Sequence, residues 1–144
     1  MSFARKRIVF DTSTLVACCL NPDRLPNQVL QITFREHLAF ASQEALAELA
    51  QVLSRDKFDL WRPLEERLTF VAAYTSSVRL IEVAVVATEC RDPKDNKFLS
   101  LAAAAKASWL VSSDDDLLSM GQYSGSQIIS PRQLLALLDP LPQK

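Results

Sequence analysis

Four acidic residues in this chain of 144 residues occupy positions from which carboxylates could bind a metal ion. Asp11 ends a short apolar run, Asp114 follows another, and Asp95 lies near a proline that can open a helix. Glu48 lies in a stretch with helical spacing of apolar residues. Carboxylates gathered at one site repel one another unless a cation neutralises them. Mg²⁺ and Mn²⁺ prefer oxygen ligands, and Mg²⁺ combines a few carboxylates with substrate phosphate oxygens. Such a cluster would suit phosphodiester hydrolysis, although each acid taken singly has a structural explanation.

Two of these positions have an acidic neighbour that could take the same role. Glu44 precedes Glu48 by one helical turn and shares its face of the expected helix, but it also lies where an acid favours the helix dipole. Asp92 stands directly before Pro93, where it is expected to cap a helix. That capping role is sufficient to explain Asp92, so Asp95 is the better ligand candidate.

The elements that must position these acids alternate along the chain. Strands are expected at residues 7–11, 37–41, 78–87, 108–111 and 128–129. Helices are expected at residues 12–20, 27–37, 43–54, 63–75 and 94–106 and from residue 130 onward, and a loop at residues 112–116. This pattern predicts an α/β domain with a largely parallel sheet covered by helices on both faces. Ligands bind beyond the carboxyl ends of such strands, where Asp11 and Asp114 are expected.

Composition limits the class of protein. With 49% hydrophobic residues, the chain can build one domain over residues 1–144, with a core at about 6–138 and a short C-terminal tail. No apolar run approaches the roughly 20 residues of a membrane span, and no signal-peptide pattern is present, so a cytoplasmic protein without membrane contact is expected. A net charge of −1 means that RNA binding would need a local basic patch. The three cysteines show no metal-ligand spacing and are expected to be buried free thiols.

Three ordered blocks make the chain resemble the PIN domain family, in the branch of toxins of toxin–antitoxin systems. The blocks are RIVFDTSTLV, SQEALAELAQVLSRDKF and RDPKDNKFLSLAAAAKASWLVSSDDDLL. The resemblance implies a three-layer α/β/α sandwich around a mainly parallel sheet. It also implies that the metal-binding and catalytic acids are Asp11, Glu48, Asp95 and Asp114.

The resemblance also assigns secondary roles. Glu48 rather than Glu44 takes the family's helical position, because Glu48 directly precedes Leu49 in an Ala-Glu-Leu unit. Asp116 is a possible auxiliary acid, while the alternation of the loop turns Asp115 away.

Two hydroxyl residues stand where the family commonly has other side chains. Ser13 replaces a frequent asparagine and Ser112 a frequent threonine. Both carry a hydroxyl that can donate a hydrogen bond near the acids, so both are auxiliary candidates.

The activity implied by the resemblance is metal-dependent endoribonuclease activity, in which one or two Mg²⁺ or Mn²⁺ ions promote in-line attack of water on an RNA phosphodiester. Candidates for contacts with the RNA backbone are Arg55, Lys57, Arg62 and Lys97, which a solvated surface explains equally well. The implied partners are RNA, a small antitoxin protein and a second copy of the chain.

Two other functions fit parts of the sequence. Asp11-Thr12-Ser13-Thr14 after a strand superficially resembles the nucleophile loop of haloacid dehalogenase-like phosphatases. That family places a second aspartate two residues after the first, and here Ser13 stands there. The other alternative is a PIN fold without catalysis that serves as a binding or scaffold module.

Overall fold

A six-stranded sheet with strand order β3-β2-β1-β4-β6-β5 forms the centre of the computed structural model, which describes residues 4–138. The strands are β1 (Arg7–Phe10), β2 (Leu38–Ala41), β3 (Arg79–Leu80), β4 (Trp109–Val111), β5 (Gln122–Tyr123) and β6 (Ser126–Ile129). Every pair is parallel except β5 with β6. The predicted mainly parallel sheet is therefore confirmed, whereas the predicted C-terminal tail lies outside the described residues.

The central strands are buried on both sides, and their side chains alternate between two cores. In β1, Ile8 and Phe10 join one core while Val9 joins the other. In β4, Val111 joins the first core and Leu110 joins the second. This period of two divides the apolar residues between the two faces of the sheet.

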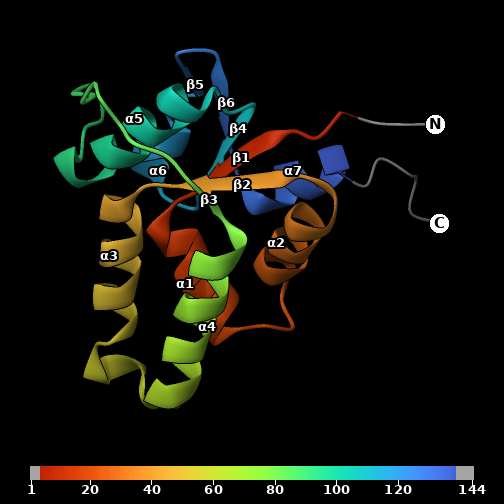
Figure 1. Cartoon of the computed structure of the whole chain (residues 1–144), viewed down its shortest axis with the longest axis vertical. Coiled ribbons are helices and arrows are strands. Elements are labelled where there is room, and N and C mark those ends of the chain that lie inside the picture. Colours follow the sequence, from red (N-terminus) through yellow and green to blue (C-terminus); the bar gives the residue numbers. More distant parts are fainter. Residues whose placement is uncertain (1–3, 139–144) are drawn as a thin grey trace.

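Helices cover both faces, which gives the three-layer α/β/α sandwich that was predicted (Figure 1). One core packs α1 (Thr12–Leu20), α2 (Leu25–Glu36), α3 (Gln43–Leu53), α4 (Leu64–Ser77) and α7 (Pro131–Leu138). The other packs α5 (Asn96–Ala105) and α6 (Asp115–Leu118). Helix α3 borders both cores, because Leu49 and Leu53 face the first and Ala45 the second.

The segment after α4 departs most from the prediction. A strand over residues 78–87 is wrong beyond Leu80, and only Arg79–Leu80 pairs with the sheet. The β-branched residues Val85 and Val86 are 78% and 73% exposed, so no sheet face buries them. Instead, the Ala87 amide donates to the Ser100 hydroxyl at 2.7 Å, which ties the irregular segment to α5.

Two element boundaries were also predicted incorrectly, and one strand was missed. The 94–106 helix is divided into the 3₁₀ turn η2 (Pro93–Asp95) and α5, the 112–116 loop already begins α6 at Asp115, and the antiparallel strand β5 was missed. A second 3₁₀ turn, η1 (Asp56–Phe58), follows α3. The predicted cap of α3 is present, because the Ser42 hydroxyl accepts from the Ala45 amide at 3.1 Å.

Two predictions from composition can be compared with residues 4–138. In that part of the chain, no helix has the length and apolar character needed to cross a lipid bilayer. The three cysteines, Cys18, Cys19 and Cys90, are buried and free, as predicted.

Candidate active site

The candidate site lies where the direction of strand succession reverses. β1 is flanked by β2 on one side and β4 on the other, so the chain runs outward from β1 in both directions. The Asp11 amide donates to the Val111 carbonyl at 3.0 Å, and the Ser112 amide donates to the Ile129 carbonyl at 3.0 Å. Asp11 and Ser112 therefore lie together at the carboxyl ends of the central strands, the usual ligand position in open α/β sheets.

Asp11 is the most deeply buried of the acids, with only 2% of its surface exposed. Its carboxylate caps α1 by accepting from the Thr14 amide at 2.9 Å, and it accepts from the Ser13 hydroxyl at 3.1 Å. The Ser112 hydroxyl also donates to it. Burial raises the pKa of Asp11, while the hydrogen bonds from Ser112, Thr14 and Ser13 act in the opposite direction.

Asp114 is fixed by the loop that joins β4 to α6. Its amide donates to the Ser112 hydroxyl at 2.9 Å, so one serine connects Asp114 to Asp11. Its carboxylate caps α6 by accepting from the Asp116 amide at 2.8 Å. The proposed auxiliary Ser112 therefore lies between two of the four acids.

Asp95 reaches the same place from the turn before α5, and it lines the same cavity as Asp114. Burial raises the pKa of Asp95 to about 7, with further contributions from Asp114 and from the charges of Asp92 and Asp11. Within residues 4–138, the buried Asp95 Oδ2 atom has no hydrogen-bond partner. A buried carboxylate oxygen without a partner is expected where a cation belongs.

Glu48 approaches from α3, on the opposite side of the site. Its carboxylate accepts from the Thr12 hydroxyl at 2.6 Å and from Lys97 Nζ at 3.2 Å. Glu44, one turn earlier, is exposed and lines a different cavity. The geometry thus places Glu48, and not Glu44, with the other acids.

A cavity of about 450 Å³ brings these side chains together. Its lining includes the acids Asp11, Glu48, Asp95 and Asp114. Arg55 and Lys57, which were predicted to contact substrate, also line it, and so does Lys94, which was not predicted.

The other two predicted cations, Arg62 and Lys97, do not line this cavity. The Arg62 guanidinium donates to the Cys19 carbonyl at 2.6 Å and to Glu66 at 3.0 Å, and it does not line the acidic cavity. Lys97 is paired with Glu48, so its contact is with an acid of the site.

Asp92 is the residue of the site that sequence analysis undervalued. It caps the turn as predicted, accepting from the Lys94 amide at 3.1 Å, but it also lines the acidic cavity. Carboxylate oxygens of Asp92, Asp95 and Asp116 all lie within 4.8 Å of one another. The spacing of three residues between Asp92 and Asp95 was the available signal, because a helical turn places such residues on one face. Asp116 also pairs with Arg91 at 2.9 Å.

This donor set fits a hard divalent cation. The ligands on offer are carboxylate oxygens, one buried oxygen is without a partner among residues 4–138, and the neighbouring acids contribute to the raised pKa of Asp95. Each of these properties favours binding of Mg²⁺ or Mn²⁺, which take oxygen ligands.

The sheet and the acidic cavity define an α/β domain with a carboxylate site at its topological switch point. The PIN domain family model matches residues 7–116. The chain therefore belongs to the PIN domain family, as its sequence blocks indicated.

One relative in sequence is similar at low identity. The chain is 28% identical over 116 residues to the uncharacterized protein MJ1680 of Methanocaldococcus jannaschii, an alignment that covers 79% of this chain and 74% of that protein.

Solved structures show the same fold at low identity. PAE2754 from Pyrobaculum aerophilum superposes with a TM-score of 0.63 at 16% identity, covering 94% of this chain and 91% of that one. VapBC2 from Rickettsia felis, solved bound to a DNA fragment from their promoter, gives 0.59 at 13% identity, with 86% and 98% covered. VapC20 from Mycobacterium tuberculosis, described as a Sarcin-Ricin loop cleaving toxin, gives 0.56 at 14% identity, with 81% and 97% covered.

Proposed function

We propose that this PIN domain is a metal-dependent endoribonuclease that hydrolyses phosphodiester bonds of RNA and acts in the cytoplasm as the toxin of a toxin–antitoxin pair. The observation that carries the proposal is the convergence of four carboxylates, from four separate segments of the chain, on one cavity at the sheet's switch point. The resemblance in fold to VapC20 supports the choice of RNA as substrate.

The residues proposed to hold the cation are Asp11, Glu48, Asp95 and Asp114. A bound Mg²⁺ or Mn²⁺ ion supplies a Lewis acid that produces a nucleophile from water near neutral pH and offsets charge developing on the phosphodiester.

The neighbouring hydroxyl and ammonium groups position these carboxylates. Ser13 and Ser112 donate to Asp11, which fixes the orientation of its carboxylate. Thr12 and Lys97 each hold one oxygen of Glu48. A site held by such supporting contacts keeps its ligands in place without reorganisation during the reaction.

The RNA backbone requires cations that the chain as a whole does not offer, since its net charge is −1. Arg55, Lys57 and Lys94 supply them locally, because all three line the acidic cavity. They are proposed to contact phosphates on either side of the bond that is cleaved. Arg62 is left out of this set because protein groups already bind its guanidinium.

The test is cleavage of mixed cellular RNA by the purified protein with Mn²⁺, with Mg²⁺ and with EDTA. We expect cleavage only with metal, loss of cleavage in Asp11→Asn, and full cleavage in Asp115→Asn, whose side chain is exposed and lies outside the cavity. Asparagine keeps the cap of α1, so the first variant should stay folded.

Other outcomes would support the two alternative functions, a scaffold module or a phosphatase. RNA binding without cleavage at any metal concentration would indicate a scaffold module. Release of phosphate from a small phosphomonoester would indicate a phosphatase, against which stands Ser13, because it hydrogen-bonds Asp11 and cannot act as an acid or base in place of an aspartate.

The antitoxin and the dimer are further parts of the proposal. The VapBC2 complex of Rickettsia felis has a similar fold, which supports a small protein partner. Co-expression with the product of an adjacent gene should give a stable complex with suppressed cleavage, and light scattering of the isolated chain should give the mass of a homodimer. A monomer at all concentrations would contradict the dimer alone.

A further inference from the structure

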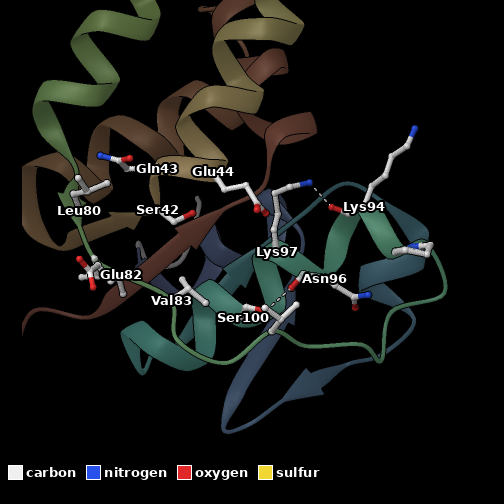
Figure 2. Close-up of a pocket in the computed structure, with 13 residues that line it drawn as sticks. Ser42, Gln43, Glu44, Leu80, Glu82, Val83, Lys94, Asn96, Lys97 and Ser100 are labelled. Carbon is white, nitrogen blue, oxygen red and sulfur yellow. Dashed lines mark hydrogen bonds between the residues drawn. The ribbon is translucent and has the colours of Figure 1, made fainter.

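A second cavity, of about 660 Å³, is shown in Figure 2, and it shares the lining residue Lys94 with the acidic cavity. Its walls come from the start of α3 at residues 42–44, the irregular segment at residues 80–86 and the turn and helix at residues 93–100. Its volume is in the range of small-molecule binding pockets.

The two cavities share a boundary made of lysines. Lys94 lines both of them. Lys97 lines the second cavity, and its Nζ atom donates to Glu48 of the acidic site and to the Lys94 carbonyl. A polyanion that occupies the acidic cavity and extends into the second one thus passes Lys94, whose ammonium has no partner within residues 4–138.

The second cavity combines an apolar wall with two carboxylates that are unpaired within residues 4–138, those of Glu44 and Glu82. Ile81, Val83 and Val86 form the wall. Figure 2 shows the Glu44 side chain extending from α3 toward Lys97 across the cavity. Within residues 4–138, the Glu44 carboxylate takes part in no hydrogen bond or ion pair.

The Ser100 and Asn96 side chains of this cavity are already engaged by protein groups. The Ser100 hydroxyl accepts from the Ala87 amide at 2.7 Å and donates to the Asn96 carbonyl at 3.0 Å. The Asn96 side-chain oxygen accepts from the Cys90 amide at 2.8 Å. The Gln43 and Glu82 side chains also have no hydrogen-bond partner within residues 4–138, but Figure 2 shows both at the end of the cavity away from Lys97, so Glu44 is the unpaired acceptor nearer to the acidic site.

Resting on the proposed ribonuclease function, we propose that this cavity binds the base of a nucleotide adjoining the cleaved bond, and that Glu44 selects guanine. Single-stranded RNA is recognised through unstacked bases whose polar edges meet protein groups. A carboxylate only accepts hydrogen bonds, and guanine is the base whose edge presents two adjacent N–H donors. The apolar wall covers the face of the base, while Lys94 meets a flanking phosphate. The residue shared with the acidic cavity favours RNA over a protein segment as the occupant, because a strand bound at the acids continues past Lys94.

Binding without metal tests this proposal separately from catalysis. Fluorescence anisotropy in EDTA would compare a labelled single-stranded RNA of uridines with one of alternating guanosine and uridine. The wild type should bind the guanosine-containing RNA roughly tenfold more tightly. Glu44→Gln should lose this preference and bind the uridine RNA unchanged, because the lysines are intact.

Two further variants keep the result interpretable. Glu65→Gln removes an exposed acid of α4 that lines neither cavity, and it should keep the full preference. Val86→Asp changes an exposed residue of the wall and should weaken binding of both RNAs.

Equal affinity of the wild type for the two RNAs, or an unchanged preference in Glu44→Gln, would overturn the base-binding proposal. If metal-dependent cleavage blocked by Asp11→Asn were still observed, the proposed function would stand, and a protein segment would replace RNA as the expected occupant of the second cavity. Absence of both RNA binding and cleavage would overturn the two proposals together.

Discussion

At the scale of single residues, Glu44 and Glu48 show how one helical turn separates two kinds of site. Their carboxylates are displaced by roughly 6 Å along the helix axis. Glu48 meets Thr12 and Lys97 in the acidic cavity, while Glu44 faces the second cavity.

We expect Glu48→Gln to lower cleavage of mixed RNA by roughly a hundredfold or more, the scale for loss of a group that stabilises transition-state charge. Glu44→Gln should change total cleavage little and alter only which sequences are cut. Initial rates and mapped cleavage ends would measure the two effects. A larger loss of rate in Glu44→Gln would reverse the assignment of the two acids.

The Asp95 carboxyl gives the metal-free protein a dependence of stability on pH. Its pKa is raised from 3.8 to about 7, so the folded state holds this proton more tightly than the unfolded chain does. The stabilisation is complete below the unfolded pKa and is lost as pH rises toward the folded pKa. Asp11, whose pKa is also raised, acts in the same direction.

Thermal unfolding in EDTA should therefore show a Tm that falls from about pH 4 to about pH 7. Asp95→Asn should flatten part of this fall and raise the Tm at the alkaline end, because one ionised group is removed from the cluster. An identical pH profile in wild type and Asp95→Asn would show that the cluster does not strain the folded state.

The residues that sequence analysis found are those with a local signal. Asp11 and Asp114 follow strands, and Asp95 and Glu48 stand at recognisable positions in helical segments. Lys94 was missed, because it reaches the cavity only through the path of the η2 turn. The residues next to Lys94 in the sequence do not specify that path.

At the scale of elements, the connection between α3 and α4 depends on one buried arginine. Arg67 has no exposed surface, and its guanidinium donates to the carbonyls of Leu53, Arg55 and Arg62 at 2.6, 3.0 and 2.9 Å. It also pairs with Asp59. This clamp fixes the segment that carries Arg55 and Lys57 to the acidic cavity.

Arg67→Met should lower the free energy of unfolding by about 3 kcal/mol, because buried carbonyls lose their donor. Where the variant remains folded, it should also bind RNA more weakly, since Arg55 and Lys57 lose their fixed position. Urea unfolding and RNA anisotropy would measure the two effects. Arg132→Met, on the exposed side of α7, is the matched control, and equal stability of both variants would refute the clamp.

Elements were predictable where the pattern of burial was regular. The strands β1, β2 and β4 are apolar runs buried on both faces, so their sequence reports their structure directly. The segment over residues 81–92 also contains β-branched residues, but they lie on the surface and not in a strand. Composition alone cannot distinguish these two situations. The two-residue strand β5 is too short to leave a periodic signal.

At the scale of the whole molecule, the acidic cavity joins carboxylates from the two halves of the chain, and the ion proposed to bind there would connect them. Mn²⁺ should raise the Tm of the wild type, because a ligand bound only by the folded state stabilises it by mass action. Asp11→Asn should have a higher Tm than the wild type without metal and a smaller shift with it. Calorimetric melting with and without Mn²⁺ would test this, and an equal metal shift in both proteins would place the ion elsewhere.

The pairing of Lys97 with Glu48 has a consequence for how many ions the site can take. When fully ionised, the four carboxylates carry four negative charges, of which the lysine offsets one. An acid that binds a metal ion is deprotonated, so three negative charges remain when Asp95 is a ligand. One divalent ion therefore leaves one negative charge, and two ions would leave one positive charge. A second ion would then enter together with the negative charge of the RNA itself, which makes substrate and metal loading cooperative.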